Sequence, residues 1–63
     1  MKTGVVYTET VVHGETPFQL AIIALDDDEG GRLTARIAGD RVAIGDAVEF
    51  VEDRGGVAFF RLR

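Results

Sequence analysis

Apolar and polar residues alternate in three short segments of the second half of the chain: Arg32 to Ala38, Ala47 to Glu52 and Val57 to Leu62. Two stretches rich in Gly, Asp and Arg separate these segments and have the composition of turns. Alternation at every second residue lets one face of a strand pack inward while the other meets water. The pattern therefore predicts three short strands of a small β-barrel.

Two further strands are predicted in the first half. The segment Gly4 to His13 is rich in Val, Thr and Tyr, which suit a pleated surface. Its length predicts that it bends and pairs on both sides, which closes a five-stranded barrel. The segment Phe18 to Asp26 is apolar on both faces. Such a strand is either central or has its outer face covered by a partner, and the sequence leaves both interpretations open.

The alternation also predicts which side chains face inward, namely Leu33, Ala35, Ile37, Val48 and Phe50. The connection between the third and fourth strands is too short for a full helix. We expect at most one helical turn, capped by Asp40 and ended by Gly45, with Val42 and Ile44 plugging the open end of the barrel. The stretch DRGG predicts a tight reversal before the last strand, with glycines at positive φ.

The length and composition limit how such a barrel is stabilised. Sixty-three residues allow one domain, residues 1–63, and a domain of this size buries only about 60% of the surface of its unfolded chain. The sequence has no Cys and a single His, so neither a disulfide nor a protein-only zinc site is expected. We therefore expect the sheet to close on itself or the chain to form oligomers. The absence of Cys and of an N-terminal export signal predicts a cytoplasmic protein without a membrane-spanning segment.

The charge balance bears on the class of partner. Seven basic and eleven acidic side chains give a net charge of −4, which disfavours binding to a polyphosphate backbone. The arginines are nevertheless grouped by strand face, with Arg32 and Arg36 on one face and Arg61 and Arg63 on another. Because acidic residues are interleaved with them, the sequence favours solvated strand faces over a basic patch.

Residues suited to catalysis are scarce. The chain has no Ser and no Cys, and His13 has no identifiable relay partner, so we expect no enzyme activity, no catalytic residue and no cofactor. The acidic run Asp26 to Glu29 lacks the alternating spacing of a calcium loop, so a solvated hairpin tip is favoured over a metal site. Phe59 and Phe60 are neighbours on one strand, so one of them must face outward.

Five strands with a vestigial connection after the third describe a Greek-key barrel of the oligonucleotide/oligosaccharide-binding (OB) type. Within that class, the run from Pro17 to Val51 resembles the OB domain of the accessory proteins that combine a zinc ribbon with an OB fold. The resemblance extends over nearly the whole chain, but the paired Cys of a zinc ribbon are absent from it. It rests on the first-strand pattern, the Pro-aromatic start of the second strand, the acidic-Gly turn and the entry to the fourth strand: Gly4, Val6, Tyr7, Thr8, Thr10 and Val12; Pro17 and Phe18; residues 26–31; Ile44, Gly45 and Val48.

The resemblance implies a non-catalytic subunit or scaffold of a thiolase-type enzyme of acyl-CoA chemistry. We therefore expect an interaction module whose partner is such an enzyme or a second copy of the chain. The alternative is a single-stranded nucleic-acid binder, because an OB face with exposed aromatic and cationic side chains stacks bases and contacts phosphates. The residues predicted to form the interaction surface are Tyr7, Ile23, Arg32, Arg36, Phe59 and Arg61.

Overall fold

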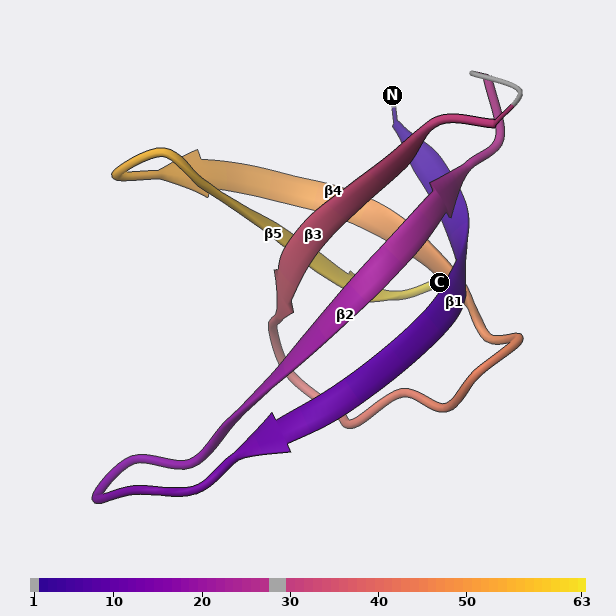
Figure 1. Cartoon of the computed structure of the whole chain (residues 1–63). Helices are drawn as coiled ribbons and strands as arrows, with labels where there is room; N and C mark the ends of the chain where they lie inside the picture. Colours follow the sequence, from indigo (N-terminus) through magenta and orange to yellow (C-terminus); the bar gives the residue numbers. More distant parts are fainter. Residues whose placement is uncertain (1, 28–29) are drawn as a thin grey trace.

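The computed structural model describes residues 2–27 and 30–63, and it contains five strands in chain order. These are β1 (Thr3–Val12), β2 (Phe18–Leu25), β3 (Arg32–Ile37), β4 (Ala47–Arg54) and β5 (Val57–Leu62). They form a closed barrel in the order β1-β2-β3-β5-β4 (Figure 1). The predicted all-β fold, a five-stranded barrel of the OB type, is confirmed.

Strand β1 closes the barrel because it pairs on both sides, as predicted. It runs antiparallel to β2 along most of its length, and its first residues also run antiparallel to the start of β4. The register with β2 shifts between Val6 and Thr8, which is a β-bulge that lets the strand bend. The crossover that makes the topology a Greek key is the parallel pairing of β3 with β5, from Ala35 opposite Ala58 to Ile37 opposite Phe60.

The core is built from the alternate inward residues of every strand. The largest fully buried side chains are those of Phe60, Ile23, Val6 and Val48. The predicted inward residues of β3 and β4 lie in this core or pack against it. Phe60 meets Phe50 edge to face, with ring centroids 5.7 Å apart. Of the two adjacent residues Phe59 and Phe60, the one that faces outward is therefore Phe59.

The two apolar faces of β2 are now distinguished. Gln19, Ala21 and Ile23 point into the barrel, whereas Phe18, Leu20 and Ile22 are half-buried on the outside. The prediction that Ile23 belongs to an interaction surface is therefore wrong, because its side chain is 0% exposed. Because the two faces of β2 have nearly equal hydropathy, the sequence does not indicate which of them points into the barrel.

The connection between β3 and β4 contains no helical turn. Asp46, rather than Asp40, organises it: the Asp46 carboxylate accepts a hydrogen bond from the Ala43 amide at 2.7 Å, and the Asp46 amide donates to the Ala43 carbonyl at 3.0 Å. Val42 plugs the barrel as predicted, at 6% exposed, but Ile44 is 67% exposed and plugs nothing. The prediction of a helical turn capped by Asp40 is wrong, because the short polar side chain of Asp46 closes the turn locally.

Strand β4 is longer than predicted and ends at Arg54 rather than Glu52. Gly55 and Gly56 alone make the reversal into β5, with φ values of 58° and 82°. Positive φ at both central residues is typical of the two-residue hairpin turn whose twist matches the flanking strands. The β1–β2 and β4–β5 hairpins both project from the barrel (Figure 1). The predicted acidic hairpin tip includes residues 28 and 29, which lie outside the described residues. In the part of the chain that is described, no helix is long and apolar enough to cross a membrane.

Candidate interaction face

Arginine side chains lie over aromatic rings at several places on the outside of the barrel. The Arg32 guanidinium lies 4.2 Å from the ring centroid of Tyr7, which is 53% exposed. Tyr7 follows Val6 at the β-bulge of β1, and Arg32 begins β3, so the two come together across β2. This pair unites two of the predicted surface residues.

A second and larger cluster forms where β2, β3 and β5 lie side by side. The Arg36 guanidinium lies 4.0 Å from the ring centroid of Phe18 and 5.7 Å from that of Phe59. The Arg54 guanidinium approaches Phe59 at 5.6 Å. Strand pairing explains the arrangement, because Arg36 is the register partner of Phe59 on one side and of Leu20 on the other. We call these four residues, Phe18, Arg36, Arg54 and Phe59, the Arg–Phe cluster.

The predicted residue Arg61 lies apart from the Arg–Phe cluster. Its guanidinium is held by Glu49 of the neighbouring strand β4, with N···O distances of 2.8 and 2.9 Å. Both nitrogens contact the same Glu49 oxygen, Oε2, and an ion pair whose arginine is this exposed contributes modestly to stability. Arg61 therefore serves the β4–β5 pairing, and the structure does not bring it together with Arg32 or Arg36.

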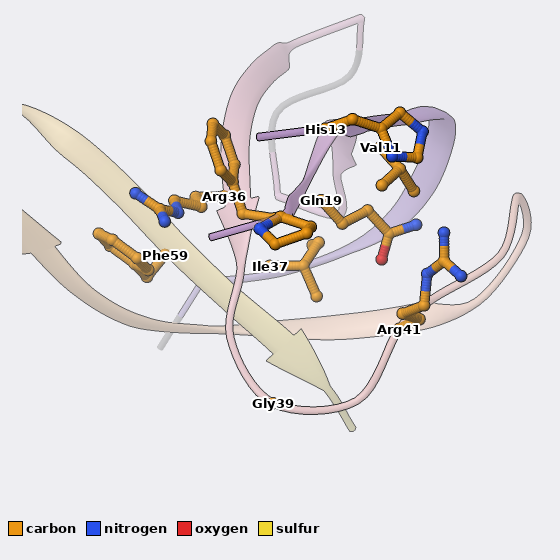
Figure 2. Close-up of a pocket in the computed structure, with 10 residues that line it drawn as sticks. Val11, His13, Gln19, Arg36, Ile37, Gly39, Arg41 and Phe59 are labelled. Carbon is orange, nitrogen blue, oxygen red and sulfur yellow. The ribbon is translucent and has the colours of Figure 1, made fainter. Parts of the chain in front are cut away.

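A groove of about 600 Å³ opens beside the Arg–Phe cluster, at the end of the barrel that the β1–β2 and β3–β4 loops flank. Val11, Pro17 and Ile37 contribute its apolar lining. Figure 2 shows Arg36 and Phe59 on one side of Ile37, and His13 and Arg41 on the other. A groove of this volume accommodates an organic group or several side chains rather than a single ion.

A buried amide fixes the wall of this groove that carries Arg41. The Gln19 side chain donates a hydrogen bond to the Val42 carbonyl at 2.8 Å and accepts one from the Val42 amide at 2.9 Å. Both partners are buried, so the pairing satisfies polar groups that would otherwise be costly to remove from water. Gln19 thereby ties the β3–β4 loop to β2, next to Arg41.

The sequence reasoning missed several residues of this region. Its predicted interaction surface did not include Phe18, His13, Arg41 or Arg54. One feature of the sequence bears on Phe18. It is the neighbour of Gln19 in a strand, so the two side chains point to opposite faces. The Gln19 amide needs hydrogen-bond partners, which the backbone at the end of the barrel supplies. No pattern in the sequence indicates that the β3–β4 loop brings Arg41 beside β1.

Comparison with known families assigns the fold to a branch of OB domains. Residues 1–52 match the family model described as ChsH2, C-terminal OB-fold domain. The chain belongs to this family. The predicted resemblance to the OB domain of zinc-ribbon accessory proteins is thereby confirmed, with no zinc ribbon in these 63 residues.

The family is associated with thiolase-like acyl-CoA enzymes, and its lone OB-fold domains are generally non-catalytic. No curated protein and no solved structure matches the chain.

Proposed function

We propose that this chain is a non-catalytic accessory module that binds a thiolase-type enzyme of acyl-CoA chemistry. Membership of the ChsH2 C-terminal OB-fold family carries this proposal, because that family is associated with such enzymes. The role of the module is to hold or position its partner, and the chemistry belongs to the partner.

The side chains on the outer face of the barrel support the proposal that the partner is a protein. Arg and aromatic side chains are enriched at the energetic centres of protein interfaces, where they combine a large apolar area with directed hydrogen bonding. Stacking on Phe18 and Phe59 restricts the Arg36 side chain before any partner arrives. Such restriction lowers the entropy that binding costs.

Affinity capture from the cells that make the protein tests the proposal. We expect the tagged chain to enrich a thiolase-type enzyme, identified by mass spectrometry. A Phe59→Ser variant removes a ring of the Arg–Phe cluster and is expected to reduce the enrichment at least tenfold. Leu62→Ser is the matched control, because Leu62 is an exposed apolar residue of the same strand, is 43% exposed and lies outside the cluster. Failure to enrich any thiolase-type enzyme would contradict the proposal.

A second copy of the chain is the alternative protein partner. A 63-residue core without disulfides is marginal, and self-association would stabilise it. Light scattering of the purified chain at micromolar concentration distinguishes a homodimer from a monomer. A mass near twice the 6.8 kDa of one chain supports a homodimer, whereas a monomer leaves the face free for another protein.

The second candidate function is binding of single-stranded nucleic acid. Its support is the set of outward arginine–aromatic pairs, Arg32 with Tyr7 and Arg36 with Phe18 and Phe59, on an OB barrel. The net charge of −4 opposes it, so it stands second.

A further inference from the structure

The groove beside the Arg–Phe cluster has two cationic ends and an apolar floor. Arg36 stands at one end, over Phe18 and near Phe59, and Arg41 stands at the other with the His13 imidazole (Figure 2). Ile37 lies between the two ends. Among the described residues, none that lines the groove is acidic.

The two groove arginines differ from Arg54 and Arg61 in how their charge is balanced. Arg54 pairs with Glu52 at 3.0 Å and Arg61 pairs with Glu49 at 2.8 Å. Within residues 2–27 and 30–63, neither Arg36 nor Arg41 forms an ion pair with a carboxylate. On a chain that carries eleven acidic side chains, two arginines thus face one groove with their charge uncompensated by the described residues.

The chemistry of such a groove selects a ligand with matching parts. Guanidinium groups bind carboxylates through charge-assisted hydrogen bonds, which are stronger than neutral ones. The apolar floor and the Phe rings favour an aliphatic or aromatic group between the two anionic ends. A polyphosphate offers negative charge but no apolar centre to cover the floor of the groove.

We infer that the groove binds an acidic segment of a protein partner, with carboxylates at Arg36 and Arg41 and an apolar side chain on the Ile37 floor. The inference rests on the proposed function and names the part of the partner that the module recognises. Gln19 contributes as a positioning residue, since its hydrogen bonds to Val42 hold the loop that presents Arg41.

Selection from a random peptide display library tests the inference without knowledge of the partner. The immobilised wild-type chain should enrich peptides in which acidic residues flank an aliphatic or aromatic one. An Arg36→Gln/Arg41→Gln variant should lose that enrichment by on the order of tenfold or more. The control is Arg61→Gln/Arg63→Gln, which also removes two positive charges, but from outside the groove. This variant should still enrich the same peptides as the wild-type chain.

Several results would overturn the inference: no enriched motif, a motif without acidic residues, or an acidic motif that persists in the groove variant. Arg36 packs on two rings, so thermal melting of each variant is measured alongside. The single variant Arg41→Gln, at an exposed loop position, provides a second test that does not disturb this packing.

The outcome is separable from that of the proposed function. If the wild-type chain and the groove variant capture a thiolase-type enzyme equally well, the accessory role stands and the groove inference fails. If acidic peptides are selected through the groove but no thiolase-type enzyme is captured, the groove inference stands and the proposed partner is wrong.

Discussion

Gly4 lies where β1 passes close to Ile23 and Ala24 of β2. A Cβ at this position would lie 2.5 Å from the Ile23 Cγ2 and 2.6 Å from the Ala24 carbonyl oxygen. The second of these atoms belongs to the backbone of a paired strand, which cannot move aside without disturbing the ladder. The absence of a side chain at Gly4 is thus a condition for closing the barrel over Ile23.

Replacement of Gly4 by Ala is expected to destabilise the fold by about 1–3 kcal/mol, the usual cost of overpacking. In a domain of this size, each kcal/mol lowers the melting temperature by roughly 4–8 °C. Gly14→Ala is the matched control, because a Cβ there meets no atom within 4 Å, and its effect is expected to stay within about 0.5 kcal/mol. Equal melting temperatures for the two variants would contradict this account.

Among the residues that the structure describes, Gln19 is the one buried polar residue. Replacement by Leu fills a similar volume but leaves the Val42 amide and carbonyl without their partners, and each buried unsatisfied group costs about 1–3 kcal/mol. We expect a large loss of stability in urea and faster hydrogen exchange at the Val42 amide. Thr3→Val removes an exposed hydrogen bond to Asp26 and is expected to cost less than about 1 kcal/mol, because water replaces the lost partner. Unchanged exchange at Val42 in Gln19→Leu would show that the loop does not depend on this side chain.

Among the elements, β5 shows most clearly how alternation divides adjacent residues between structure and surface. Phe60 is 0% exposed and completes the core, whereas Phe59 lies outside between Arg36 and Arg54. The chain thereby presents one ring to the core and the next to the outer surface.

Truncation of the two rings is expected to have very different effects. Phe60→Ala should cost about 3–5 kcal/mol, enough to unfold a domain of marginal stability. Phe59→Ala loses contacts with two arginines and should cost on the order of 1 kcal/mol. Circular dichroism melting curves of the two variants test this, and comparable losses would place both rings in the core.

The elements also show how far the sequence alone predicts the fold. Alternation predicted β3, β4 and β5, and residue composition predicted β1 and β2. The limits of β5 were correct, because turn residues bound that strand on one side. The limits of β4 were not, because the charged residues Asp53 and Arg54 resemble a turn in composition but belong to a hairpin whose turn is only Gly55 and Gly56.

The candidate site was only partly predictable. Alternation placed Arg32 and Arg36 on one face of their strand, and the adjacent Phe residues required one outward ring. The inward phase of β2 was not predictable, since both its faces are apolar and its deciding contact, Gln19 with Val42, joins residues far apart in the sequence. Strand pairing, which brings Phe18 and Phe59 to opposite sides of Arg36, is likewise a property of the closed barrel.

For the protein taken as one charged body, the net charge of −4 disfavours a nucleic-acid partner. We expect no binding of single-stranded DNA or RNA at physiological ionic strength tighter than the ~10⁻⁴ to 10⁻⁶ M of non-specific association. Fluorescence anisotropy with mixed-sequence oligonucleotides measures this. A sub-micromolar complex that falls steeply with salt and is lost in Arg36→Ala would favour the nucleic-acid function instead.

We propose that a thiolase-type partner binds the face formed by the Arg–Phe cluster and its groove. Hydroxyl-radical footprinting of the captured complex tests it most directly, because it reports the solvent exposure of individual side chains. We expect Phe18, Phe59 and His13 to be protected in the complex, while the exposed Leu62 reacts as it does in the free chain. Protection of Leu62 with no change at Phe18 and Phe59 would contradict the account and place the partner on another side of the barrel.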